Sequence, residues 1–252
     1  MFESFRRWLG RREPEPMPAE MAERLERTVP LVARLPPGDR AELERLTMTF
    51  LAEKHFEGAG GLDLTDEMRL TIAGQACLLL LHRDTDVYPD LDTILVYPST
   101  YVSKEARRDG PVVIEGDVAR LGESWNRGVV VLAWDAVKSG TRNFGDGHNV
   151  VLHELAHQLD AEDGAMDGAP ELHGSARYGA WARVLGAEYE ELVRKVESGR
   201  KSDIDGYGAT SPPEFFAVVT EQFFEKPAQL RARHPELYDV LADFYQQDPA
   251  SL

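Results

Sequence analysis

The stretch VVLHELAHQLD, residues 150–160, decides how this chain of 252 residues is organised. On a helix, His153 and His157 project from one face, one turn apart. Two imidazoles at that spacing can bind one Zn²⁺ ion, and Glu154, one step round the helix, can then hold and deprotonate a water molecule. The stretch therefore predicts a helix that carries part of a zinc-peptidase site. The alternative is a buried helix whose histidines bond to carbonyl groups.

The boundaries of this helix can also be predicted. The loop before it ends in residues that favour a helix N-terminus, so we expect the helix to begin near Asn149. It should stop by Gly164, and the polar segment 163–174 then forms a rim or loop of the site. His148 precedes His153 by five residues and falls off its face. We therefore interpret His148 as a loop residue and exclude it as a ligand.

Composition limits the classes of protein to consider. The chain is 42% hydrophobic and carries a formal net charge of −16. It can bury a sizeable core, but a direct nucleic-acid partner is not expected, because phosphate binding needs a basic face. The single cysteine, Cys77, lies in an apolar run and predicts a core residue without a disulfide framework. With no membrane-spanning run and no signal-peptide pattern, we expect a cytoplasmic protein that does not bind membranes.

Helical periodicity dominates the first part of the chain. Apolar residues recur at helical spacing between residues 19 and 56. Residues 62–82 predict a break followed by a strongly apolar helix, capped by Asp63 or Thr65. We therefore expect residues 19–84 to form a helical scaffold.

Short strands are expected between this scaffold and the histidine helix, in residues 85–135. Three apolar runs separated by Gly, Pro and Asp are typical of strands: 93–97, 111–114 and 128–134. The last run, over residues 129–134, is the best candidate for a sheet edge that pairs with extended substrate backbone. A strand buried on both sides is the alternative reading of this run.

The complete pattern predicts an α+β fold with an N-terminal helical scaffold, a small mixed sheet and a helical C-terminal half. Helices are expected over residues 180–197 and 235–245, in addition to the one opened at Ser211. We expect residues 1–18 to be a mobile segment. Residues 19–252 then form a single domain, in which 146–252 supply the metal site and its surrounding helices.

Two histidines leave a catalytic zinc short of one protein ligand. Asp163 stands where the metzincin pattern places its third ligand, but that pattern requires a glycine where this chain has Asp160. The other source is the helix opened by Ser211, on which Glu214 and Glu221 share one face. Glu214 can instead complete a capping box with Ser211, and Glu221 can form a salt bridge or support a ligand. The residues alone leave these alternatives open.

Three stretches together resemble the Mlc titration factor A family: HELAHQLD at 153–160, YGATSPPEFFAV at 207–218 and FYQQDP at 244–249. The likeness runs through nearly the whole chain, including residues 122–125. This family is identified as zinc metallopeptidases whose catalytic core is similar to the metallopeptidase domain of anthrax toxin lethal factor. The resemblance therefore implies a zincin-like fold of the gluzincin type.

The resemblance also implies roles for particular residues. Glu214 would be the third ligand of one Zn²⁺ per chain, beside His153 and His157, and Tyr207 the active-site tyrosine next to the base Glu154. A lethal-factor-like site carries a further acid where this chain has Val218. Support for the ligands must then come from another residue, for which Glu221 and Asp160 are the candidates.

Two functions follow from these observations. The first is a zinc-dependent aminopeptidase or short-peptide hydrolase with a peptide as substrate. The second, implied by the family name, is a regulatory protein that binds and sequesters the glucose-responsive repressor Mlc or a similar regulator, without contacting DNA itself. A non-catalytic binding module would perform only the second.

Overall fold

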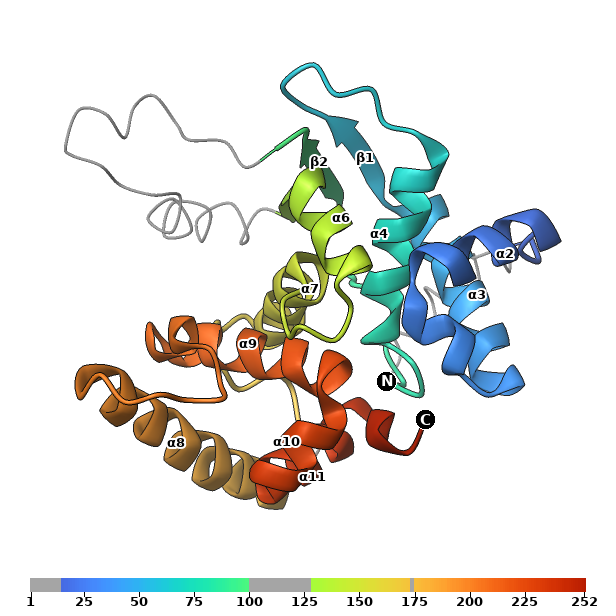
Figure 1. Cartoon of the computed structure of the whole chain (residues 1–252). Helices are drawn as coiled ribbons and strands as arrows, with labels where there is room; N and C mark the ends of the chain where they lie inside the picture. Colours follow the sequence, from blue (N-terminus) through green and yellow to red (C-terminus); the bar gives the residue numbers. More distant parts are fainter. Residues whose placement is uncertain (1–14, 100–127, 173–174) are drawn as a thin grey trace, which may run out of the picture.

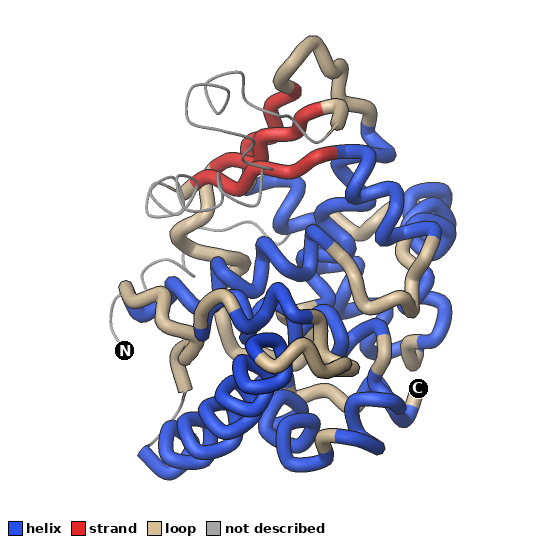
Figure 2. Tube along the Cα trace, turned by 60° about the vertical axis from the view of Figure 1, so that its left-hand side comes forward, coloured by secondary structure: helices blue, strands red, loops and turns tan. Residues whose placement is uncertain are grey.

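The computed structural model of this chain describes residues 15–99, 128–172 and 175–252. Most of the predicted mobile segment therefore lies outside the described residues. The same holds for the expected strand at 111–114 and for the family-like residues 122–125. Within the described part, a small sheet lies at one end of the molecule and helices make up the rest (Figure 2).

Helices make up most of the N-terminal segment, residues 19–84. They are α2 (Ala19–Thr28), the 3₁₀ helix η1 (Pro30–Arg34), α3 (Pro37–Glu53) and α4 (Asp66–Leu78). Thr65 is the N-cap of α4, where its hydroxyl accepts a hydrogen bond from the Met68 N–H at 3.2 Å. All residues from Leu70 to Leu78 are buried, Cys77 among them. The apolar run of α4 thus forms the centre of this half of the core.

The sheet has three strands among the described residues, β1 (His55–Gly58), β2 (Thr93–Tyr97) and β3 (Val129–Ala133), in the order β1-β2-β3. Two of them confirm predicted strands, but β1 lies inside the segment expected to be helical scaffold. The expected mixed sheet is wrong for these strands, because both pairs are parallel. Helix α4 lies between β1 and β2 and carries the chain back to the starting edge, which gives strands of the same direction.

Strand β3 forms one edge of this sheet, since β2 is its partner on one side among the described strands. Burial alternates along it, with Val130 and Leu132 buried and their neighbours partly exposed. The alternative of a strand buried on both faces is therefore not observed. The chain passes directly from β3 into α6 (Trp134–Arg142) and then into α7 (Val150–Asp160), which carries both histidines.

The predicted limits of the histidine helix agree with the structure. The Asn149 side chain accepts hydrogen bonds from the N–H groups of Val151 and Leu152, at 3.1 and 3.2 Å. A 3₁₀ turn, η4 (Ala161–Asp163), follows α7 and ends at Gly164, whose φ of 87° lies in the left-handed region. The loop and the cap thus fix where α7 begins and ends.

The C-terminal half is entirely helical among its described residues. Its elements are α8 (Ser175–Glu197), η5 (Gly206–Ala209), α9 (Pro212–Glu225), α10 (Pro227–Arg233), α11 (Pro235–Tyr245) and η6 (Pro249–Ser251). Helix α9 packs against α7, while α8, α10 and α11 lie beyond α9, away from the sheet (Figure 1). Aromatic rings of α8, α9 and α11 meet here, with Trp181, Phe216 and Phe244 separated by 5.3 to 5.8 Å between centroids.

Helix α9 is the most enclosed element of the C-terminal half. Every residue from Glu214 to Glu225 on it is buried, although three of them are glutamates. Buried carboxylates are costly unless they are paired, so each must have a partner. None of the helices in the described parts of the chain combines the length and the apolar character needed to cross a bilayer.

Candidate metal centre

The two histidines of α7 lie side by side and face α9. Their ring centroids are 5.0 Å apart, and the ring planes are inclined at 78°. His157 is almost fully buried, whereas 12% of the His153 side chain is exposed. The spacing of four residues thus brings both rings to one side of the helix, as expected.

Glu214, in the first turn of α9, completes this arrangement. Its Oε2 atom lies 3.0 Å from Nε2 of His153 and 3.5 Å from Nε2 of His157. The Ser211 hydroxyl accepts a hydrogen bond from the Glu214 main-chain N–H at 3.4 Å. Ser211 therefore caps the helix through the backbone, which leaves the Glu214 carboxylate for the two histidines. The two roles that seemed to compete in the sequence are compatible.

The arrangement fits a metal ion. Tetrahedral zinc with ligand distances of about 2.0–2.2 Å requires ligand atoms about 3.3–3.6 Å from one another. The distance from Glu214 Oε2 to His157 lies within that range and the distance to His153 is slightly shorter, and ligand atoms of all three residues lie within 4.8 Å of one another. Two imidazoles and one carboxylate are a known ligand set of catalytic zinc. The three residues thus fit a metal ion with small movements.

The carboxylate and the two imidazoles at this centre shift one another's pKa values. Burial raises the pKa of Glu214, but its hydrogen bonds to His153 and His157 outweigh this and lower the pKa to about 2. Burial also lowers the pKa of His153, but its bonds to Glu214 and Glu221 prevail and raise it well above the usual value. The pKa of His157 is lowered, mainly by burial. The carboxylates of Glu214 and Glu221 thus interact strongly with the His153 ring.

Glu221, two turns beyond Glu214, supports the first histidine. Its Oε1 atom lies 2.8 Å from Nδ1 of His153, and its Oε2 atom accepts a hydrogen bond from the Asn149 N–H. A carboxylate on the far nitrogen fixes the tautomer and orientation of a ligating imidazole. Of the two residues considered for this support, Glu221 is the one in contact with a histidine.

Glu225 is a further anchor that the sequence did not reveal. Its carboxylate accepts hydrogen bonds from the Gly147 N–H at 2.9 Å and the Asn149 amide at 3.2 Å. The same Asn149 amide donates to Gln75 of α4 at 2.7 Å. These bonds hold the start of α7 against α9 and the scaffold. The sequence signal that could have identified Glu225 is its spacing, because it lies one turn beyond Glu221 on the same helix face.

The Asp160 carboxylate binds a neighbouring loop and does not support a histidine. It is fully buried, and it accepts a hydrogen bond from the Gly168 N–H at 2.9 Å. Trp181 donates to the carbonyl of the same Gly168 at 2.8 Å. Burial raises the pKa of Asp160 to about 7, although the Gly168 N–H partly offsets this. The loop is thereby held against Pro212, two residues before Glu214.

Replacing Gly168 with alanine is expected to disturb this contact strongly. Its φ is +81°, and an added Cβ would lie 2.6 Å from the Pro212 carbonyl oxygen. We expect a loss of at least about 2 kcal/mol in the free energy of unfolding, together with weaker zinc binding, because the start of α9 must move. Denaturant titration and chelator competition measure the two effects.

Gly164→Ala is the matched control for this substitution. Gly164 has a similar φ of +87°, but an added Cβ would have no atom within 4 Å. We expect a cost of about 1 kcal/mol from backbone conformation alone, without loss of zinc affinity. Equal effects at Gly164 and Gly168 would show that the contact with Pro212 is unimportant.

The two predicted catalytic side chains lie close to the histidines. Glu154 adjoins His153 on α7, and burial, with smaller contributions from Glu214 and Glu221, raises its pKa to about 8 against the effect of His153. The ring of Tyr207 in η5 lies 5.9 Å from that of His153, between centroids. Asp205 caps η5 by accepting a hydrogen bond from the Tyr207 N–H at 2.8 Å.

The remaining candidates lie outside this group. Asp163 accepts a hydrogen bond from the Ala165 N–H at 2.9 Å and does not belong to the metal-binding group found among the described residues. His148 lies in the loop before α7, as expected, with its Nε2 atom 3.7 Å from Asp205. Of the alternatives for a third ligand, the structure therefore brings Glu214 to the histidines.

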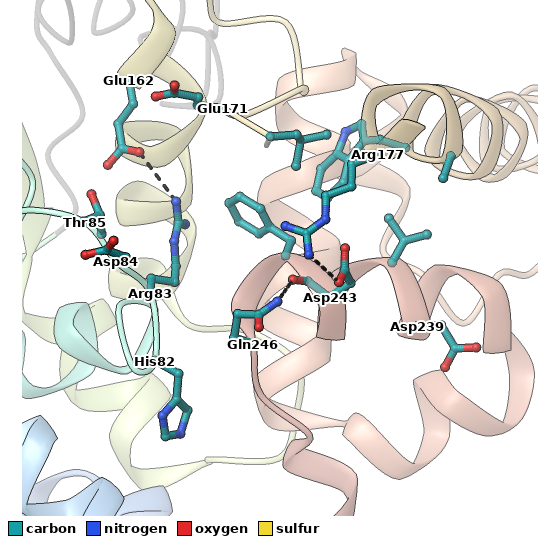
Figure 3. A pocket seen from close by; sticks show the side chains of 15 residues that line it. His82, Arg83, Asp84, Thr85, Glu162, Glu171, Arg177, Asp239, Asp243 and Gln246 are labelled. Atoms are coloured by element: carbon teal, nitrogen blue, oxygen red, sulfur yellow. Dashed lines mark hydrogen bonds and ion pairs between the residues drawn. The ribbon is translucent and has the colours of Figure 1, made fainter. Parts of the chain in front are cut away.

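Cavities lie near both ends of α7. One of about 420 Å³ adjoins the first turn and is lined in part by His153 and Glu221. The other, also about 420 Å³, lies at the C-terminal end beside Glu162. Its facing walls carry the ion pairs Arg83–Glu162 at 3.6 Å and Arg177–Asp243 at 3.0 Å (Figure 3). The second cavity is therefore separate from the one that the histidine lines.

The sequence of this chain matches a family model and several known proteins. The family model described as glucose-regulated metallo-peptidase M90 matches residues 4–246. Mlc titration factor A of Klebsiella pneumoniae strain 342 is 31% identical over 246 residues, which cover 96% of this chain and 92% of the relative. The same factor of Serratia proteamaculans is 33% identical over 222 residues, 85% of this chain and 84% of the relative.

A further relative is more similar in sequence. An uncharacterized protein of Synechocystis is 45% identical over 248 residues, which cover 96% of this chain and 90% of the relative. The match to the family model, over residues 4–246, includes the histidine helix and α9.

Proposed function

This chain belongs to the glucose-regulated metallo-peptidase M90 family, together with the Mlc titration factor A proteins, and from this premise we propose that it is a zinc-dependent peptidase of the gluzincin type. The observation that carries the proposal is the convergence of His153, His157 and Glu214, from two helices, at distances that suit one zinc ion. The adjacent Glu154 and Tyr207 are the side chains expected to carry the proton transfer and to stabilise the oxyanion.

In the proposed reaction, Glu154, Tyr207 and Glu221 each have a separate role. Zinc, when bound, would polarise the scissile carbonyl and lower the pKa of a water toward about 7. Glu154 accepts the proton of the attacking water and later delivers it to the leaving amine. Tyr207 donates a hydrogen bond to the carbonyl oxygen as negative charge develops on it. Glu221 keeps the His153 ring oriented throughout.

Strand β3, which is an edge among the described strands, suggests how a peptide would be aligned. The backbone groups on the open side of an edge strand can pair with an extended peptide. Strand β3 leads into α6, and both elements pack against α7. A peptide paired with β3 would therefore run past the first turn of the histidine helix.

Metal analysis combined with peptide cleavage tests this function. We expect about one zinc per chain, hydrolysis of short peptides, loss of activity with a chelator and recovery when zinc is restored. A fully zinc-loaded chain that cleaves no peptide in a broad panel would contradict the proposal.

Replacing Tyr207 with phenylalanine is expected to lower turnover about 10- to 1000-fold, because it removes one hydrogen bond to the developing oxyanion. The ring and its position beside His153 are kept, so zinc content should not change. Steady-state kinetics and metal analysis check both parts. Turnover equal to that of the wild type would mean that Tyr207 serves only in packing.

A second function is favoured by the printed names of the relatives, which describe titration of Mlc. We propose that this chain also binds a repressor of the Mlc type by protein contact. A pulldown with purified Mlc would test this, using wild type and Glu154→Gln. Equal capture by both variants would show that binding is independent of hydrolysis. Absence of capture at micromolar concentrations would contradict the regulatory role.

A further inference from the structure

The cavity beside the first turn of α7 lies against His153, one of the three proposed metal ligands. It has a volume of about 420 Å³, and His153 and Glu221 form part of its wall. A group that enters it therefore lies next to a proposed zinc ligand. The cavity beside Glu162 is different, because neither His153 nor Glu221 lines it.

The wall that faces these residues is built from small side chains of α6. Ala136, Ser139 and Gly140 all line the cavity, and their spacing places them on one face of the helix. At Gly140, an added Cβ would lie 3.2 Å from the His148 carbonyl oxygen, so the helix and the loop are in close contact there. Space for a ligand thus results from the small size of residues 136 and 139.

Several hydrogen-bonding groups around the cavity are already engaged, although the Ser139 hydroxyl and the His148 ring also line it. Both Glu221 oxygens accept bonds, from His153 and from the Asn149 N–H. The Asn149 side chain is bonded to Gln75, to Glu225 and to two N–H groups of α7. A polar side chain that entered would lose its water and find few new partners, which is unfavourable. An apolar side chain makes no hydrogen bonds to water, so its entry has no such cost.

The carboxylates that line the cavity are not matched there by a lysine or an arginine of the described part of the chain. Asp146 and Glu221 both line it, and no lysine or arginine does so among the described residues. The Asp146 carboxylate accepts a hydrogen bond from the His148 N–H at 2.9 Å, which keeps it beside the opening. An acidic side chain would therefore be repelled, since like charges at short range in a partly buried site are unfavourable.

From these observations we infer that this cavity is a specificity pocket for an uncharged apolar side chain of the size of leucine or phenylalanine, next to the scissile bond of the substrate. The inference rests on the proposed peptidase function. The lining assigns selectivity chiefly to Ala136 and Ser139, because larger residues there would fill the pocket. Substrates with alanine at this position need none of that space.

Two series of quenched-fluorescence peptides test the pocket. The residue immediately before or immediately after the cleaved bond is varied among Ala, Leu, Phe, Gln and Glu. In one series, wild-type kcat/KM should be about tenfold or more higher for Leu and Phe than for Ala, as expected for filling an apolar pocket. In the same series, Glu should be cleaved at least about tenfold less efficiently than its isostere Gln.

Ser139→Leu and Ala136→Leu then identify the site of this selectivity. Each should lower kcat/KM for Leu and Phe peptides about tenfold or more, while Ala peptides stay within about threefold and zinc content is unchanged. Leucine suits a helix, and both positions are at least partly exposed, so the fold should persist. Arg142→Leu, an exposed position of α6 outside the cavity, is the matched control and should leave every ratio unchanged.

The outcomes separate the pocket from the function. If wild type cleaves peptides but the Leu:Ala ratio is the same in Ser139→Leu, Ala136→Leu and Arg142→Leu, the pocket is assigned wrongly. Cleavage without any preference for Leu or Phe would also overturn it. If the zinc-loaded wild type cleaves none of the peptides, the proposed function itself fails.

Discussion

Replacing Glu154 with glutamine is expected to reduce peptide hydrolysis about 100- to 10,000-fold while zinc remains bound at one ion per chain. Glutamine has the shape of the glutamate but cannot accept the proton of the attacking water, which is the step assigned to a general base. The ligands His153, His157 and Glu214 are untouched, so metal content should not change. Steady-state kinetics with zinc analysis on the same preparation measure both quantities.

A control for this substitution is Glu190→Gln. Glu190 lies on the exposed surface of α8, where its carboxylate is 3.7 Å from Arg194. Removal of this charge should leave turnover within about twofold, because exposed ion pairs contribute little. Turnover of Glu154→Gln near the wild-type level would rule out Glu154 as the base.

Replacing Glu214 with alanine should weaken zinc binding by more than about 100-fold. Residues that merely support a ligand already contribute about 10- to 100-fold, and the loss of a ligand should exceed this. The substitution also leaves the partly buried His153 with a single carboxylate partner, Glu221, in place of two. Competition with a chelator of known affinity measures the change, and far-ultraviolet circular dichroism checks the fold.

Asp163→Ala is the informative control, because Asp163 is the alternative third ligand in the sequence. We expect its zinc affinity to match the wild type, since its carboxylate is engaged with the Ala165 N–H. Zinc retained in Glu214→Ala but lost in Asp163→Ala would reverse the assignment and support the metzincin-like arrangement.

Local signals predicted the elements that carry the site. Asn149 and Ser211 are favourable caps, and both helices begin where these residues place them. The short strand β1 was missed because Phe56 is its one buried residue, which gives no alternating pattern to recognise. The parallel direction of the sheet also depends on how the chain returns through α4, and local sequence does not encode that path.

Long-range contacts explain what the sequence could not reveal. Glu225 reaches Gly147 across 78 positions, and neither residue carries a motif that points to the other. The contact of Gly168 with Pro212 could not be predicted either, because it depends on a loop held by Asp160 and Trp181. Glu214 could be singled out in the sequence through family resemblance, since spacing alone left Asp163 as an alternative.

The separation between α7 and α9 has a consequence for the synthesis of the protein. Glu214 follows His153 by 61 positions, and at about 5–20 residues per second the ribosome needs roughly 3–12 s to add them. Throughout that interval the nascent chain has both imidazoles but neither Glu214 nor Glu221. We therefore expect tight zinc uptake only after α9 has emerged and docked. Zinc analysis of ribosome-stalled chains ending before and after residues 212–225 would reveal this order.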